Sequence, residues 1–247
     1  MIEEDSMSKF SKLIHKITKR PFCSVVVVAA GSSTRAGRDK LFYSLGGTPV
    51  LAHTLQVFEN CPQVNEIILV MREDRIPEAA ELCRQYGLQK VKKILCGGAT
   101  RTESALSGVS ETDPKADLIA IHDGARPFVT EELMQALIHD AVLYHAAAPG
   151  LPLRDTLKHV EKDTAVFTVP RAETVAIQTP QVFQADLIKA ALSSAVEKKL
   201  EITDDCSAVE AMGFSVHVTP GSEENIKITL PIDFMLAETI RKTREQS

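Results

Sequence analysis

Short apolar runs alternate with amphipathic stretches from residue 24 to residue 145. Runs nearly continuous in Val, Ile and Leu, typical of strands that helices cover on both faces, are Ser24–Ala30, Glu66–Met71, Val91–Cys96 and Asp117–His122. Apolar residues recur at helical spacing over Val50–Glu59, Ile76–Tyr86, Glu103–Ser110 and Glu131–His145. This order predicts an α/β fold with a Rossmann-like, doubly wound and mostly parallel sheet.

The regular alternation ends after Pro149. Residues 150–172 alternate polar and apolar side chains without a long helical pattern, so we expect an extended β-arm there. Beyond it we expect helices at Ala185–Lys198, Asp205–Met212 and Pro231–Thr243 and strands at Phe214–Val218 and Asn225–Thr229. Residues 23–247 are therefore expected to form a single domain, with the arm as an insertion.

Residues 1–22 are interpreted as an N-terminal extension. Apolar residues recur at helical spacing between positions 10 and 17, with lysines between them. This pattern predicts a short surface helix, and a helix lying on a membrane surface is the alternative. The apolar run Phe22–Ala30 follows basic residues, as in a secretory signal. It is shorter than the roughly 20 residues that span a bilayer, and charged residues follow it closely, so a buried strand fits better.

Charge and cysteine content narrow the classes of partner. The 247 residues include 28 Lys+Arg and 33 Asp+Glu, a net charge of −5. Such a chain lacks the basic surface that non-specific nucleic-acid binding or a polybasic membrane site needs, so we expect small-molecule substrates held by a local cluster of cations. The scattered cysteines, none in a C-x-x-C pair, indicate a reducing, cytoplasmic location; they are Cys23, Cys61, Cys83, Cys96 and Cys206.

The loop after the first expected strand, Ala29–Lys40, has the composition of a phosphate site. Small residues let backbone N–H groups approach a phosphate, and Arg35 and Lys40 would complete an anion site for more than one phosphate. Ser33 stands where a G-x-G-x-x-G dinucleotide fingerprint needs glycine, and no Gly-Lys-Ser/Thr follows for a Walker loop. An ordinary Gly/Ser turn with solvated cations is the alternative.

A second motif follows the expected strand Val91–Cys96. The segment Gly97–Ser104 offers two glycines that permit a close backbone approach, as a flat base or a ribose would require, although a plain strand-to-helix turn explains it equally well. In an open α/β sheet, ligands bind at the carboxyl ends of strands, so such motifs reinforce one another.

Asp123 lies in the segment Ile121–Pro127, at another strand end. Its carboxylate is suited to Mg²⁺, which takes one or two carboxylates plus substrate phosphates. His122 has no Cys or His at metal spacing and is expected to be structural. Arg126 is open to two readings, a salt bridge with Asp123 or an arm for a second phosphate.

The last polar group lies beyond the arm. Thr203 is equally suited to cap the following helix or to bind a ligand. Lys227 is the lone lysine in an expected five-residue strand that otherwise consists of Asn, Ile, Ile and Thr, so it is either a solvated edge residue or a phosphate ligand.

In their collinear order the motifs resemble those of the 2-C-methyl-D-erythritol 4-phosphate cytidylyltransferases of the non-mevalonate isoprenoid pathway. The resemblance covers residues 24 to about 238. The motifs that carry it are the Ala-Ala-Gly…Arg…Lys loop, Gly-Gly-x-x-Arg-x-x-Ser, His-Asp-Gly-Ala-Arg-Pro, Arg-Asp-Thr, Gln-Thr-Pro-Gln, Thr-Asp-Asp…Ser-Ala-Val-Glu and Asn-Ile-Lys-Ile-Thr.

The resemblance implies a nucleotide-diphospho-sugar transferase type of fold, with a β-arm exchanged across a homodimer. It also implies the reaction of CTP with methylerythritol phosphate, giving the CDP-alcohol and pyrophosphate with the help of Mg²⁺ or another divalent cation. Position by position, it implies a catalytic set of Arg35, Lys40 and Lys227. For CTP it implies Ala29, Ala30, Gly31, Ser33, Gly98, Arg101, Ser104, Asp123 and Gly124, with Asp123 also at the metal. For methylerythritol phosphate it implies Arg126, Thr156, Arg171, Thr179 and Thr203, with Thr156 and Arg171 coming from the partner's arm.

The chain departs from the family pattern near the first loop. Ser33 replaces a usual glycine, Ala99 replaces a usual Asp, and Asp39-Lys40-Leu41 replaces Pro-Lys-Gln after a shortened interval from Arg35. The alternatives that remain are a cytidylyltransferase for another polyol phosphate, such as ribitol 5-phosphate, a non-catalytic nucleotide-binding module, and, least favoured, an NAD-dependent oxidoreductase.

Overall fold

The computed structural model describes residues 20–31, 37 and 39–246. In this part of the chain a central eight-stranded sheet has the order β10-β7-β11-β6-β1-β4-β5, with β12 also pairing with β7. Its strands are β1 (Cys23–Ala29), β4 (Val64–Met71), β5 (Val91–Cys96), β6 (Leu118–Asp123), β7 (Ala146–Pro152), β10 (Val175–Ile177), β11 (Gln181–Gln184) and β12 (His217–Pro220). The β5-β4-β1-β6 half is parallel, and β11 runs antiparallel between β6 and β7.

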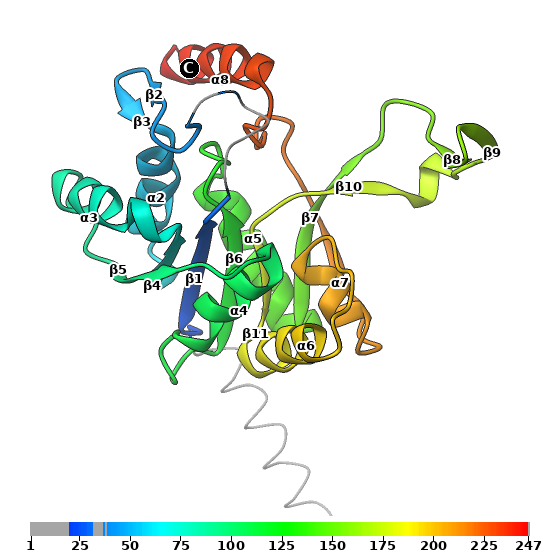
Figure 1. Ribbon diagram of the computed structural model, residues 1–247, viewed down its shortest axis with the longest axis horizontal. Coiled ribbons are helices and arrows are strands. Elements are labelled where there is room, and N and C mark those ends of the chain that lie inside the picture. Colours follow the sequence, from blue (N-terminus) through cyan, green and yellow to red (C-terminus); the bar gives the residue numbers. More distant parts are fainter. Residues whose placement is uncertain (1–19, 32–36, 38, 247) are drawn as a thin grey trace, which may run out of the picture.

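Helices cover both faces of this sheet (Figure 1). One face packs against α2 (Val50–Asn60), α3 (Ile76–Gln85) and α5 (Glu131–Tyr144). The other packs against α4 (Arg101–Ser110), α6 (Ala185–Glu197) and α7 (Asp205–Glu210). Alternate residues of β1 point to opposite faces, so Val25 and Val27 enter the first core and Val26 enters the second. The expected doubly wound α/β fold is confirmed.

The carboxyl ends of β1 and β6 lie side by side, with Val28 opposite Asp123. From β1 the chain moves outward to β4 and β5, and it then returns to the other side of β1 at β6. This reversal is the switch point of an open α/β sheet, where loops diverge and leave a crevice for ligands.

A third, smaller core holds the C-terminal helix α8 (Pro231–Glu245). Phe234 and Ala237 of α8 pack with Leu45 of the short hairpin β2 (Ser44–Leu45) and β3 (Thr48–Pro49). Ile228, which is fully buried, joins this core from the segment before α8. Figure 1 shows α8 at the top of the molecule, beyond the ends of the central strands.

The segment expected as a β-arm contains a hairpin, β8 (Lys158–Glu161) and β9 (Thr164–Thr168), followed by a 3₁₀ turn at Arg171–Glu173. Every residue of β8 and β9 is exposed, and the hairpin extends away from the sheet (Figure 1). The first residues of the expected range belong instead to β7, in the main sheet.

Two strand predictions are wrong. Asn225–Thr229 is not a strand, because its backbone makes single bonds to scattered partners, such as the 2.9 Å bond from the Ile228 N–H to the Ala125 carbonyl. The strand expected at Phe214–Val218 is displaced to β12, because Gly213 (φ +84°) and a bond from the Phe214 N–H to the Val209 carbonyl still belong to the end of α7.

The N-terminal extension falls almost wholly on residues 1–19, outside the described residues. Within the described ranges, no helix has the length and apolar character needed to cross a bilayer.

Candidate active site

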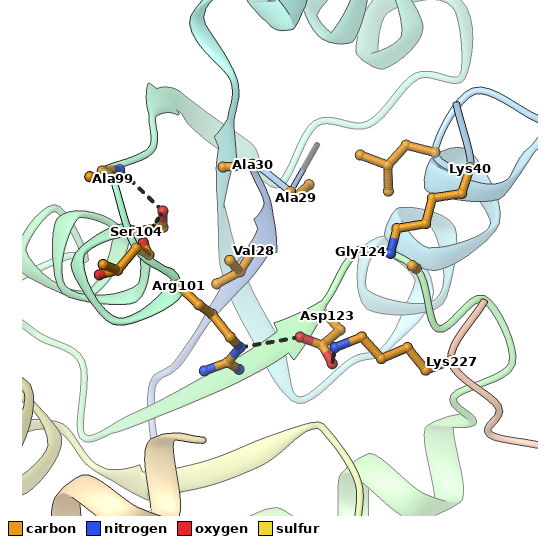
Figure 2. Close-up of a pocket in the computed structure, with 15 residues that line it drawn as sticks. Val28, Ala29, Ala30, Lys40, Ala99, Arg101, Ser104, Asp123, Gly124 and Lys227 are labelled. Carbon is orange, nitrogen blue, oxygen red and sulfur yellow. Dashed lines mark hydrogen bonds and ion pairs between the residues drawn. The ribbon is translucent and has the colours of Figure 1, made fainter. Parts of the chain in front are cut away.

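A cavity of about 390 Å³ opens at the carboxyl ends of β1 and β6. Its walls come from the end of β1 and the loop after it, the start of α4, the end of β6 and the segment before α8. The lining residues are Val28, Ala29, Ala30, Gly31, Lys40, Leu41, Gly98, Ala99, Thr100, Arg101, Ser104, Asp123, Gly124, Ala125 and Lys227. Figure 2 shows Asp123 between Arg101 and Lys227, with Lys40 pointing toward Gly124.

Asp123 is the electrostatic centre of this cavity. Its carboxylate lies 2.8 Å from Lys227 Nζ and 3.5 Å from the Nε atoms of both Arg101 and Arg126. Burial by itself would raise the pKa of Asp123, but the three cations outweigh burial and hold this pKa well below its ordinary value. Asp123 is therefore ionised, and it gathers positive side chains from three separate segments of the chain.

The backbone of Asp123 is held from below by Thr179 and His122. Thr179 Oγ1 accepts a bond of 3.1 Å from the Asp123 N–H and lies 3.1 Å from His122 Nδ1, while His122 Nε2 lies 3.1 Å from the Arg126 carbonyl. Because a carbonyl can only accept, Nε2 carries the proton, and the Thr179 hydroxyl donates to Nδ1. Burial lowers the pKa of His122 to about 4, so the ring is neutral. Both ring nitrogens of His122 are thus bonded within the protein, which fits the structural role that the sequence predicts.

The turn before α4 forms the opposite wall. Thr100 caps the helix by accepting from the Glu103 N–H, and the Glu103 carboxylate accepts from the N–H groups of Ala99 and Thr100, which is a capping box. Ser104 Oγ accepts from the Gly98 N–H at 3.1 Å. A Cβ on Gly98 would lie 2.4 Å from the Cβ of Glu103, so this turn requires glycine.

Lys227 is placed by an extended segment that side chains tie to the sheet. Asn225, which is fully buried, donates from Nδ2 to the Thr179 carbonyl at 2.9 Å, and its own carbonyl accepts from the Arg126 guanidinium at 2.7 Å. Gln178 donates from Nε2 to the Ser222 and Asn225 carbonyls. These bonds hold the backbone two residues before Lys227, so the lysine projects from a fixed point.

Lys40 lies at the end of the first loop, where its neighbours are held. Asp39 accepts from the Leu41 N–H at 3.1 Å and pairs with Arg75 at 2.7 Å. The Arg75 guanidinium stacks on the Phe42 ring at 4.3 Å. Asp39 thus anchors this stretch through its side chain, at the position where the family pattern has proline.

Comparisons with known proteins agree with this arrangement. The family model for 2-C-methyl-D-erythritol 4-phosphate cytidylyltransferase matches residues 23–243. The chain belongs to this family. It is therefore a nucleotidyltransferase that uses CTP and methylerythritol phosphate in isoprenoid precursor biosynthesis.

Relatives with this name match nearly their whole length. The cytidylyltransferase of Halalkalibacterium halodurans is 44% identical over 225 residues, which cover 90% of this chain and 98% of that protein. The cytidylyltransferase of Caldanaerobacter subterraneus subsp. tengcongensis is 42% identical, with 87% and 96% covered.

Solved structures of the family share the fold. The 4-diphosphocytidyl-2C-methyl-D-erythritol synthase of Anaerococcus prevotii superposes with a TM-score of 0.81 at 31% identity, covering 91% of this chain and 100% of that one. The cytidylyltransferase of Thermus thermophilus gives a TM-score of 0.73 at 32% identity, with 88% and 98% covered.

The site residues that the family resemblance implies fall into four groups. The structure brings to the cavity Ala29, Ala30, Gly31, Lys40, Gly98, Arg101, Ser104, Asp123, Gly124 and Lys227. Arg126 and Thr179 lie directly behind Asp123, where each is bonded to the protein. Ser33 and Arg35 lie outside the described residues.

Three residues implied for the sugar phosphate do not line the cavity of their own chain. Thr156 and Arg171 lie exposed on the arm, where Arg171 donates to the Arg154 carbonyl at 3.0 Å. Thr203 is also exposed, and it is not the cap of α7: Asp204 is, because its carboxylate accepts from the Ser207 N–H at 3.0 Å.

Four residues to which the sequence assigned no role hold the site together. Gln178, Gln181, Asp205 and Asn225 are buried polar residues at the site. All four lie inside motifs that carried the family resemblance. Buried polar side chains need partners, so an amide or acid next to apolar neighbours in such a motif was the available signal.

Proposed function

We propose that CTP binds in the cavity at the ends of β1 and β6. The observation that carries this proposal is the buried Asp123 carboxylate with Arg101, Arg126 and Lys227 around it, at the switch point of the sheet. The turn before α4, with Gly98 and its close backbone, would hold the cytosine and ribose. The triphosphate would lie between the end of β1 and the lysines.

Catalysis in this proposal consists of positioning and charge stabilisation. A phosphate oxygen of the methylerythritol phosphate attacks the α-phosphorus of CTP in line, the bond to the bridging oxygen breaks, and pyrophosphate leaves with the electron pair. Lys40 and Lys227 stabilise the charge that develops on the non-bridging and leaving oxygens, and we propose the same role for Arg35. No covalent intermediate with the protein is required.

We also propose Asp123 as the protein ligand of a divalent cation. Among the described residues, no group of three or more His, Cys, Asp or Glu side chains is arranged to hold a metal. One carboxylate at the cavity wall suits Mg²⁺ when the nucleotide phosphates complete its oxygen shell. When bound, the ion would supply charge neutralisation between phosphate oxygens.

The sugar phosphate side of the site is proposed to be completed by a second copy of the chain. Thr156 and Arg171 stand on an arm that extends away from the central sheet (Figure 1), and neither lines the cavity of its own chain. The arm exposes Val160, Val166 and Phe167, each more than half exposed, so its apolar surface is unburied within the chain. A homodimer that exchanges arms would bury this surface and deliver both polar residues to the partner's cavity.

Mixing two inactive variants tests the exchange of arms. Arg171→Ala leaves the cavity intact, and Lys227→Ala leaves the arm intact. If arms exchange, each mixed dimer has one fully wild-type site, so a refolded equal mixture recovers about one quarter of wild-type activity. If each chain builds its own site, the mixture stays at the mean of the two variants.

The substrate is tested directly. Purified protein with CTP and Mg²⁺ is expected to release pyrophosphate with methylerythritol phosphate and much more slowly with ribitol 5-phosphate. Faster turnover of ribitol 5-phosphate would assign another polyol phosphate. Absence of pyrophosphate with both would favour a non-catalytic binding module.

A further inference from the structure

Arg101 is held by a carboxylate to which no role has been given. Its Nη1 and Nη2 atoms donate to the two oxygens of Asp205 at 3.0 and 2.8 Å, a bidentate pair. The Asp205 side chain is 0% exposed, whereas Arg101 lines the cavity. Burial would lower the pKa of Arg101, but Asp205 and Asp123 outweigh burial and raise it. The guanidinium is therefore charged and fixed in its plane.

Asp205 is itself fixed to the sheet. Gln181 Oε1, from β11, accepts from the N–H groups of Asp205 and Cys206 at 3.1 and 3.0 Å, at the first turn of α7. Gln181 Nε2 donates to Asp204 at 2.8 Å. Since β11 pairs with β6, which ends on Asp123, a continuous set of bonds joins the strand bearing Asp123 to the carboxylate that orients Arg101.

We propose that Asp205 is a positioning residue for nucleotide binding, acting through Arg101. A guanidinium has five N–H donors, of which Asp205 takes two and Nε faces Asp123. The remaining donors are those that a nucleotide in the cavity can use, and the fork to Asp205 sets their direction. The inference rests on the proposed placement of CTP beside Arg101.

Replacing Asp205 by Asn tests this role. The variant puts an NH₂ donor against the guanidinium and removes the charge that holds it, so Arg101 loses its orientation. Because a hydrogen bond to a charged group is worth about 1.5–3 kcal/mol, we expect KM for CTP to rise roughly 10- to 100-fold. We expect kcat to change less and KM for methylerythritol phosphate to stay within about twofold, because these two constants do not depend on the contact between Arg101 and CTP.

The matched control removes the same charge from the same helix. Glu210→Gln changes the last, exposed residue of α7, so its KM for CTP is expected to equal that of the wild type. Should D205N fail to fold, as judged by circular dichroism, Asp205→Glu keeps the charge but moves the carboxylate by one methylene. It is expected to raise KM for CTP severalfold.

A double-mutant cycle distinguishes positioning from general damage. Arg101→Ala is expected to raise KM for CTP at least as much as D205N, and R101A/D205N is expected to match R101A alone. A normal KM for CTP in D205N and D205E, or a double variant much worse than R101A, would overturn the inference and leave the proposed site standing. A normal KM in R101A would overturn the proposed placement of CTP and this inference with it.

Discussion

The cavity and the arm are built in opposite ways. Around Asp123, groups from β6, α4, the residue pair before β11 and the segment before α8 bond to one another, and most are buried. On the arm, both strands are wholly exposed, and Arg154 forms an exposed ion pair with Glu223. The cavity is thus fixed by the fold of a single chain, whereas the hairpin of the arm is exposed.

This difference matches the two substrates as we propose to place them, with CTP in the cavity and methylerythritol phosphate beside the arm of a second copy. A nucleotide presents a base, a ribose and several charged oxygens, and a preformed set of donors binds it without the entropic cost of ordering the site. A small polyol phosphate presents few features, so enclosing it requires a surface that arrives from another direction. The packing of the cavity and of the arm indicates how strongly substitutions in each will change activity or stability.

The largest expected effect comes from the preformed half. Lys227→Ala removes the cation nearest Asp123 and is expected to lower kcat about 10²- to 10³-fold, because fixed charge is the main catalytic contribution. Pyrophosphate release under saturating CTP measures it, with Lys242→Ala, an exposed lysine of α8, as the control. A near-normal kcat in the Lys227 variant would remove this lysine from the catalytic set.

The buried His122 makes the preformed half sensitive to acid. Its folded-state pKa is about 4, against about 6.5 in the unfolded chain. The unfolded state therefore takes up the proton first as pH falls. The free energy of unfolding is thus unaffected by the titration of His122 above about pH 6.5, and it decreases progressively toward pH 4, by roughly 3 kcal/mol.

Urea unfolding at several pH values measures this loss. His122→Gln, whose amide does not titrate, is expected to be less stable at neutral pH but to show a shallower decline between pH 6.5 and 4.5. Parallel declines in the two proteins would contradict the assignment.

A substitution on the exposed apolar surface of the arm is expected to weaken dimerisation of the chain without weakening CTP binding. Phe167→Asp places a charge on its exposed apolar surface, so sedimentation should show a shift from dimer to monomer. Turnover should fall about 10- to 100-fold, as expected when a charged contact such as that of Arg171 is lost. Thr164→Asp, on the same strand, is the control. An Phe167→Asp variant that remains dimeric and active would place the interface elsewhere.

The smallest effect is expected at Lys40, whose neighbour Asp39 is held by a partly exposed ion pair with Arg75. Arg75→Gln breaks the pair with Asp39 and the stacking on Phe42. Partly exposed pairs of this kind are worth about 1 kcal/mol or less, so kcat should fall only about two- to fivefold. Arg72→Gln, which loses an exposed pair with Asp74, is the control. Equal kcat values in both variants would show that Asp39 does not help to place Lys40.

The sequence predicted the parallel half of the sheet well, because buried strands such as β1 read as continuous apolar runs. It failed at Asn225–Thr229, whose alternation of polar and apolar residues has the period of a strand although the backbone bonds to no neighbouring strand. Hydrophobic period reports which side chains are buried, not what the backbone pairs with.

For the site, motifs located most of the cavity lining but not its supports. Thr179 lies close to the cavity, but its hydroxyl bonds to Asp123 and His122 beneath the cavity and not to space where a substrate could lie. Asp205 and Gln181 act through partners distant in the sequence, and such partners become visible only when the chain is folded.

The position of Lys227 depends on the small core under the C-terminal helix α8. Ile228, its neighbour, is sealed among Phe234, Ala237 and Leu45, so the lysine emerges from a layer that contains no strand of the central sheet. Peripheral layers open with less free energy than sheet cores do. On warming, therefore, this enzyme should lose activity while its circular dichroism spectrum is still that of a folded protein. The loosening of α8 should then set the highest temperature at which the enzyme works.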